Sequence, residues 1–249
     1  MTAILEDIVS EGGRLLELAA RDGVDVRLLG GVAIRLRAPG DYPAVFDRAY
    51  KDLDFAVPPK TSAAADRFFR AAGYEPHVAF NALNSRERML FLDEDHGRQV
   101  DVFVGEFRMC HAIPLADRMR VDDGTLPLAE LLLTKCQVIE LNEKDVRDAL
   151  ALLHGHEVAD HDGDAVNAAR IAELCAADWG LWRTFTANLR VCAEHLGEYD
   201  LAPEDRERIR ARIDELQQRI EDEPKSRGWR MRARIGDRKR WYDLPEEVA

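Results

Sequence analysis

The chain has little cysteine: four residues in 249, all far apart and without a Cys-x-x-Cys pair. This spacing argues against a disulfide framework or a zinc site built on cysteine, and it is typical of a reducing compartment. No apolar run approaches the roughly 18 residues needed to cross a bilayer. The amino terminus also lacks the basic segment and apolar block of a secretory signal. We therefore expect a cytoplasmic protein without a membrane partner.

Most of the chain has few basic residues relative to acidic ones. The formal net charge is −12, and residues 225–249 hold eight basic against four acidic side chains, so residues 1–224 carry −16. An acidic body disfavours broad electrostatic binding to nucleic acid, whereas a basic tail can hold phosphates locally. The alternative is that the tail forms a helix that packs on the acidic body.

The pattern of apolar residues changes near residue 125. Before it, segments that alternate like strands mix with helical segments; after it, the periodic segments are helical. No internal repeat is visible. This order predicts an α/β (α+β) catalytic domain over 1–124, followed by a helical domain over 125–249 that ends in the basic tail. The expected strands are 24–29, 50–57, 88–94, 98–107 and a further one within 107–115, and the expected helices are 3–21, 32–38, 61–74, 126–141, 143–153, 164–177, 179–196 and 203–220.

Three aspartates interrupt two of the strands that otherwise read as core. Asp52 and Asp54 alternate with apolar residues, so both side chains lie on one face of their strand, and Asp101 lies in the middle of an apolar strand. A buried carboxylate is costly unless it is paired or binds a metal. Mg²⁺ and Mn²⁺ prefer oxygen ligands, and such ions activate and stabilise the oxygens in phosphoryl transfer. The pattern predicts a divalent-metal site, although a solvated edge strand remains the alternative for the first pair.

Two glycines, Gly30 and Gly31, stand where an expected strand gives way to a helix. Glycine lets the backbone approach a phosphate closely, and a helix amino terminus offers unpaired N–H donors. Taken alone, the pair indicates only a tight turn. Its combination with the aspartates on the two strands indicates a phosphate site.

Three short motifs follow one another in an informative order: Gly30-Gly31, Lys-Asp-Leu-Asp-Phe at 51–55 and Val-Asp-Val-Phe at 100–103. Together they resemble the DNA polymerase β-like nucleotidyltransferase superfamily. A helix with Lys135 and the Lys-Asp-Val-Arg-Asp sequence at 144–148 add a similarity to its AbiEii and MenT toxin-type branch. The resemblance covers residues 24–153 and leaves the long connection 38–51 without a role, except as a possible cover of the site.

The resemblance implies a polymerase β-like mixed sheet, an NTP substrate and Mg²⁺ or Mn²⁺ as cofactor. A nucleoside monophosphate would pass to a hydroxyl of RNA, protein or a small molecule, and a toxin would have an antitoxin partner. Alternatives are an antibiotic-type transferase with a small-molecule acceptor and a non-catalytic nucleotide- or partner-binding member. The implied metal ligands are Asp52, Asp54 and Asp101, catalytic together with Lys135, and the implied nucleotide contacts are Gly30, Gly31, Lys51, Lys135 and Asp145.

The helical part leaves simpler interpretations open. Lys135 would then extend to solvent from an apolar helix, and Asp145 and Asp148 would form a solvated helix face. Trp179 and Trp182 lie at helical spacing, which favours packing over base stacking.

The stretch 154–164 is rich in histidine and aspartate but does not fit a calcium loop. Ala165 and Ile171 stand where glycine and glutamate are needed. We expect a polar loop in which Asp164 caps the next helix.

Overall fold

The computed structural model describes residues 3–244, and the chain divides into two compact units. The sheet unit comprises Met1–Arg37, Ala49–Phe107 and Ile113–Pro127, and the helical unit comprises Ala38–Arg48, Arg108–Ala112 and Leu128–Ala249. A mixed sheet followed along the chain by helices confirms the expected fold class. The assignment of domains to 1–124 and 125–249 stays a prediction.

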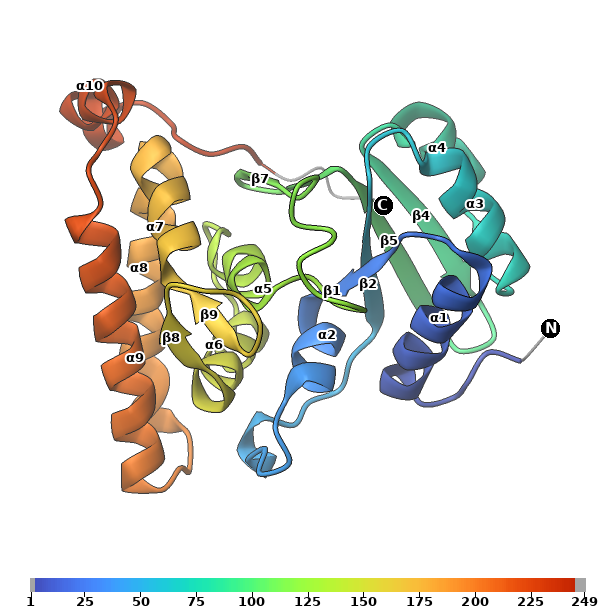
Figure 1. Ribbon diagram of the computed structural model, residues 1–249, viewed down its shortest axis with the longest axis horizontal. Coiled ribbons are helices and arrows are strands. Elements are labelled where there is room, and N and C mark those ends of the chain that lie inside the picture. Colours follow the sequence, from blue (N-terminus) through green and yellow to red (C-terminus); the bar gives the residue numbers. More distant parts are fainter. Residues whose placement is uncertain (1–2, 245–249) are drawn as a thin grey trace. The chain divides into compact units, whose positions relative to one another are not determined.

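The sheet unit is built on five strands in the order β1-β2-β5-β4-β3 (Figure 1). The central pair, β2 and β5, is parallel, and the other neighbours are antiparallel. The hairpin predicted for β4 and β5 is confirmed, as are β1 and β2, whereas the short β3 was not predicted. The bounds are β1 (Arg27–Leu29), β2 (Asp52–Val57), β3 (Glu75–Pro76), β4 (Arg88–Asp93) and β5 (Arg98–Val104).

Helices pack on one face of the central strands. The ring of Phe55 on β2 lies 5.3 Å from that of Phe69 on α3. On α1, Gly12 faces Leu53 of β2 and Val32 of α2 so closely that a Cβ there would meet Val32 at 3.1 Å. The helices of this unit are α1 (Ile8–Asp22), α2 (Gly30–Arg37), α3 (Ser62–Ala71) and α4 (Val78–Asn84), of which the short α4 was not predicted.

The expected start of α1 was wrong. The helix begins at Ile8 and not at residue 3, because the Asp7 carboxylate caps it by accepting the Ser10 N–H at 2.8 Å. Gly12 and Gly13 both lie within this continuous helix, and Gly12 gives α1 its close approach to the sheet.

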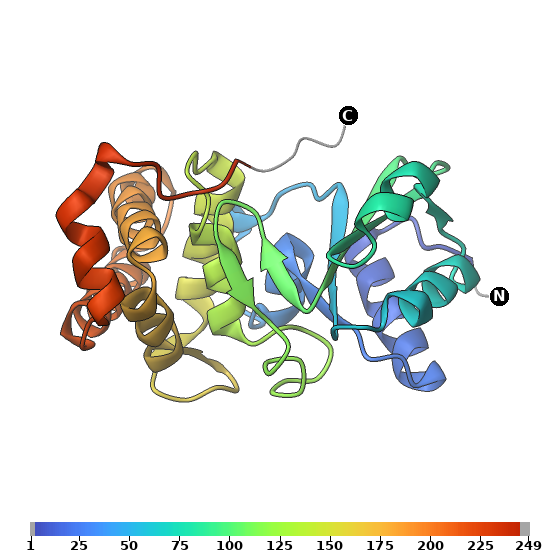
Figure 2. The same ribbon diagram turned by 90° about the horizontal axis from the view of Figure 1, so that it is seen from above.

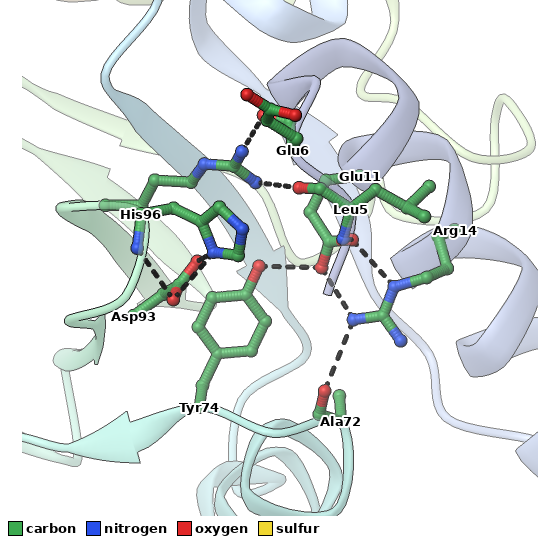
Figure 3. A network of polar contacts seen from close by, with 9 residues as sticks. Leu5, Glu6, Glu11, Arg14, Ala72, Tyr74, Asp93 and His96 are labelled. Carbon is green, nitrogen blue, oxygen red and sulfur yellow. Dashed lines mark hydrogen bonds and ion pairs between the residues drawn. The ribbon is translucent and has the colours of Figure 1, made fainter. Parts of the chain in front are cut away.

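A buried polar network joins α1 to the rest of the sheet unit (Figure 3). Glu11 is fully buried and accepts hydrogen bonds from Arg14 through both carboxylate oxygens (2.7 and 2.6 Å), from the Tyr74 hydroxyl (2.7 Å) and from the Leu5 N–H (2.9 Å). Burial, followed by the Glu11 carboxylate, raises the pKa of Tyr74 far above its ordinary value, so Tyr74 remains a donor. Nearby, Arg98 donates to the Leu5 carbonyl at 2.6 Å.

Replacing Glu11 with glutamine is expected to lower the free energy of unfolding by about 2 kcal/mol, because hydrogen bonds to a charged group are lost and the Arg14 guanidinium stays buried. Denaturant unfolding measures the change. The matched control is Glu17→Gln, on the exposed side of the same helix, with an expected change within about 0.5 kcal/mol. Equal effects of the two substitutions would contradict a structural role for the network.

The helical unit contains α5 to α10 and a two-stranded parallel sheet. The five helices expected between residues 126 and 220 are confirmed with shifted bounds, and the strand expected within 107–115 is a short hairpin instead. Within residues 3–244, no helix combines the length and apolarity needed to cross a membrane. The bounds are α5 (Leu128–Cys136), α6 (Glu143–Gly155), β8 (Glu157–Ala159), β9 (Ala165–Asn167), α7 (Ala168–Ala177), α8 (Trp179–His195), α9 (Pro203–Asp222) and α10 (Arg227–Ile235), and the hairpin consists of β6 (Glu106–Arg108) and β7 (Ala112–Pro114).

The expectation of a loop over 154–164, with Asp164 as the cap of the next helix, was wrong in two ways. Residues 157–159 form β8, and residues 165–167 pair with it as β9 instead of starting the helix. The cap of α7 is Asn167, whose side-chain oxygen accepts the Arg170 N–H at 3.1 Å. Because residues 165–167 pair with β8, α7 begins only at Ala168.

The connection whose role the sequence left open lies largely in the helical unit. Residues 38–48 carry a short 3₁₀ helix, Ala44–Phe46, and the Phe46 side chain is fully buried. Its ring lies 5.8 Å from that of Tyr199 and 5.9 Å from that of His154. An apolar anchor therefore holds this segment against the helices.

Candidate active site

The three aspartates of the sheet unit lie on one face of its central strands. In the parallel pairing of β2 with β5, Asp54 stands directly beside Asp101, and Asp52 stands beside Gln99. Side chains two residues apart share a face, so Asp52 joins the other two. This is the face opposite the one that carries Leu53 and Phe55. The register thus brings together three residues that lie up to 49 positions apart in the sequence.

Gly30 lies against the carboxylate of Asp54. It follows β1 and begins α2, with a left-handed backbone (φ +73°). A Cβ built on Gly30 would lie 2.1 Å from Asp54 Oδ2, which is closer than any real contact. Both the conformation and the contact therefore require glycine at this position. Gly31 is buried in the first turn of the same helix.

Asp101 already has strong donors on both oxygens. Arg88 of β4 donates to Oδ1 through Nε (2.7 Å) and Nη2 (2.5 Å), and the Gln99 side-chain amide donates to Oδ2 at 2.7 Å. The Arg88 guanidinium also lies over the rings of Phe80 (5.8 Å) and Phe103 (5.3 Å). The Asp101 residue is only 4% exposed, so this ion pair is largely shielded from water.

Sequence reasoning missed Arg88. The available signal was an arginine within the apolar strand 88–94, which forms a hairpin with the strand of Asp101. In the structure Arg88 pairs with Phe103, two residues from Asp101 and on the same face. Long side chains reach such diagonal neighbours across two antiparallel strands. A register derived from the turn would have brought Arg88 to Asp101.

The residues of the expected metal site are of the right type to bind a divalent ion, but their side chains are not arranged around a common position. Three carboxylates on one face supply the oxygen ligands that Mg²⁺ and Mn²⁺ prefer. Within the described part of the chain, however, no group of three His, Cys, Asp or Glu side chains is arranged to hold a metal ion. Asp101 in particular is not available as a metal ligand in this arrangement, because Arg88 and Gln99 donate hydrogen bonds to both of its carboxylate oxygens.

The helical unit brings Lys135 and Asp145 together in a second polar cluster. The Lys135 ammonium lies 3.1 Å from Asp145 Oδ1 and 2.8 Å from Asp148 Oδ2. Arg48 donates to both oxygens of Asp148 at 2.8 and 2.6 Å. The Lys135 side chain is only 13% exposed, so it does not simply extend to solvent. Asp148 is likewise buried and is not part of a solvated helix face.

The charges in this cluster set the titration of Asp148. Its burial favours the neutral acid, but Lys135 and then Arg48 outweigh that effect and lower the pKa of Asp148 below its ordinary value. A carboxylate with a lowered folded-state pKa stabilises the fold above the pKa of the unfolded chain. That contribution is lost as the pH falls through the folded-state pKa.

Asp148→Asn is expected to reduce the free energy of unfolding by about 2 kcal/mol at about pH 7. The difference from the wild type should shrink as the pH falls toward about 3, because the wild-type carboxylate then takes up a proton. Denaturant unfolding at several pH values measures this. Asp200→Asn removes an exposed carboxylate of the same unit and should leave stability nearly unchanged. A difference that does not vary with pH would mean that Asp148 acts through packing and not through its charge.

Lys51, the remaining residue expected at the nucleotide, is exposed and directly precedes β2. Between residues 3 and 244 it takes part in no ion pair. Its contact with a nucleotide stays a prediction.

The comparisons with known proteins add little to this geometry. No family model matches the chain, and no curated protein matches it. Among solved structures, the chain is similar to a STING-associated CdnE c-di-GMP synthase from Capnocytophaga granulosa. That match has 12% sequence identity and a TM-score of 0.27, and it covers 86% of this chain and 80% of the synthase. A likeness of this size carries no functional argument, and no match supports the toxin-type branch.

Proposed function

We propose that the protein is a metal-dependent nucleotidyltransferase, which moves a nucleoside monophosphate from an NTP to a hydroxyl group and releases pyrophosphate. The observation that carries the proposal is the parallel register of β2 and β5, which sets Asp54 beside Asp101 with Asp52 on the same face. Asp101 is buried, Asp54 is half-buried and Asp52 is exposed, and a divalent cation would offset the repulsion between carboxylates that lie this close together. The close approach of Gly30 to the Asp54 carboxylate supports a site at this edge of β1 and β2.

Asp52 and Asp54 would hold Mg²⁺ or Mn²⁺, and Asp101 would complete the ligand set. The ion would polarise the phosphate oxygens and offset the charge that develops on them. Asp101 is the carboxylate proposed to help the acceptor hydroxyl lose its proton. Because Arg88 and Gln99 bind both of its oxygens, Asp101 reaches an ion or a hydroxyl only when one of these hydrogen bonds is released or shared.

The remaining roles concern the phosphates of the NTP. The backbone N–H groups at the start of α2, at Gly30 and Gly31, are proposed donors to the triphosphate. Lys135 is proposed to offset phosphate charge, with Asp145 beside it, and Lys51 is a further proposed contact. Asp148 is then a positioning residue, because its carboxylate contacts the Lys135 ammonium directly.

RNA, protein and small-molecule hydroxyls remain open as acceptors of the proposed transfer. A toxin activity controlled by an antitoxin, as the sequence resemblance implies, is one form of it, and an antibiotic-type small-molecule transferase is another. A non-catalytic nucleotide-binding protein is the alternative from a different class. The intact set of three aspartates favours turnover over binding alone.

The test is to incubate the purified protein with each α-phosphate-labelled NTP and Mg²⁺ or Mn²⁺, in the presence of cellular RNA, protein or a small-molecule extract. The proposal expects label to pass from one NTP to one class of acceptor, with pyrophosphate released and with loss of both on chelation. Binding of an NTP without label transfer or pyrophosphate release under any of these conditions would favour the non-catalytic alternative.

A further inference from the structure

Helix α10 has an inner side that packs against its own unit and an outer side that is exposed. On the inner side, the Arg232 guanidinium lies 4.4 Å from the ring centre of Trp179, and the ring of Trp229 lies 5.1 Å from that of Trp182. Arg232 also donates to the carbonyls of Gly236 and Lys239. These contacts place α10 beside α7 and α8, as Figures 1 and 2 show. The tail therefore packs on its own unit through one side only.

The outer side carries a line of arginines. Arg227, Arg230 and Arg234 are exposed, and their spacings of three and four residues put them on one face of the helix. Two exposed apolar side chains lie beside them, Met231 (69% exposed) and Ile235 (44% exposed). Within the structure's described range, none of the three arginines forms an ion pair, whereas Arg183 of the same unit pairs with Asp237.

This arrangement is unusual for the composition of the chain. Acidic residues outnumber basic ones by 47 to 35, so carboxylate partners are plentiful. Like charges three and four residues apart on a helix repel one another and cost stability. Arg238 and Lys239 extend the exposed positive charge beyond the helix. A concentration of exposed positive charge on an otherwise acidic molecule attracts a polyanion to this one face.

We propose that the outer face of α10 binds the phosphate backbone of single-stranded RNA through Arg227, Arg230 and Arg234. Guanidinium groups bind phosphate with two parallel hydrogen bonds, and a regular line of them suits a repeating phosphate chain. Met231 and Ile235 offer apolar contacts to the unstacked bases of a single strand. This surface depends on α10 alone and stands whether or not the sheet unit transfers nucleotides.

Two other partners fit this face less well. A helix that lies in a membrane surface needs a wide apolar face, but the side of α10 that carries Trp229 is packed against its own unit. A stable protein interface needs an apolar core with charges at its rim, whereas here three arginines accompany only two exposed apolar residues. The charge pattern therefore favours a polyanion that contacts each guanidinium in turn.

The test compares the wild type with Arg227→Gln/Arg230→Gln/Arg234→Gln by fluorescence anisotropy on a labelled RNA of about 16 nucleotides. A control of equal charge change, Arg67→Gln/Arg86→Gln/Arg120→Gln, removes three exposed arginines elsewhere. Over about 50 to 200 mM salt, the α10 variant should bind more weakly and should flatten the slope of log K against log salt by about 2 units, roughly 0.7 for each lost phosphate contact. The control should behave as the wild type.

Three results would overturn the proposal. They are the absence of RNA binding by the wild type at the lowest salt, equal losses in the α10 variant and the control, and binding to duplex DNA or anionic vesicles that is as tight as to RNA. Thermal melts complete the test. The α10 variant should have the same melting temperature as the wild type. Arg232→Gln, which removes the inward contact with Trp179, should have a lower melting temperature but the same slope of log K against log salt. A lower melting temperature for the α10 variant instead would assign its arginines to packing.

Discussion

Asp54→Asn is expected to lower the rate of nucleotidyl transfer by at least about 10²-fold, which is the usual effect of removing one electrostatic group from an active site. Asp54 lies beside Asp101 and against Gly30, so it is the aspartate with the closest structural links to both the proposed metal and phosphate sites. Asparagine keeps the size and one oxygen but removes the charge that attracts a divalent cation. The protein should still fold, because Asp54 is not fully buried.

The measurement is label transfer from the NTP that proves to be the substrate, followed at several metal concentrations. Asp95→Asn is the matched control, since it removes an exposed carboxylate from the β4–β5 turn of the same unit. It should transfer label at the wild-type rate. Activity of Asp54→Asn within a few-fold of Asp95→Asn would place the chemistry elsewhere in the molecule.

Gly30→Ala is expected to lower the free energy of unfolding by about 3 kcal/mol and to abolish transfer. The left-handed backbone alone costs an alanine about 1–2 kcal/mol, and forcing an extra group into a packed site costs about 1–3 kcal/mol more. Because the new Cβ would lie 2.1 Å from Asp54 Oδ2, the Asp54 carboxylate must move, and with it the proposed metal site.

Gly13→Ala provides the opposite control for this substitution. Gly13 lies within α1 without a left-handed backbone, and apart from its chain neighbours and the adjacent helix backbone a Cβ added to it would have no atom within 4 Å. Alanine there should raise the free energy of unfolding by about 0.5–1 kcal/mol. Thermal and denaturant unfolding of both variants measure the two effects. A Gly30→Ala protein as stable and active as the wild type would show that the close approach to Asp54 has no consequence.

The alternation of apolar and polar residues made the central strands predictable. On β2, a side chain every second residue must share a face, so the common orientation of Asp52 and Asp54 follows from local pattern alone. The position of Asp101 beside Asp54 could not be predicted from local pattern, because the two residues lie 47 positions apart and meet only through the parallel register of β2 with β5. The motif resemblance, not periodicity, suggested that partnership.

Long-range partners were the part that the sequence did not reveal. Arg88 reaches Asp101 across a hairpin whose register depends on the turn geometry, and Arg48 reaches Asp148 from a connection that carried no clear pattern. Nothing local to Lys135 shows that it lies between two carboxylates. The short α4, β3 and β8 also escaped prediction, because elements of two to seven residues are too short to show a period.

The most direct test of the central claim is a thermal melt with and without Mn²⁺ for the wild type, Asp54→Asn and Asp95→Asn. A cation that binds only the folded protein stabilises it increasingly as its concentration rises above Kd, and the melting temperature rises accordingly. If Asp52, Asp54 and Asp101 hold the ion, Mn²⁺ should stabilise the wild type and Asp95→Asn alike, and the increase should largely vanish in Asp54→Asn. No increase in the wild type, or an equal increase in Asp54→Asn, would contradict a metal site on this face.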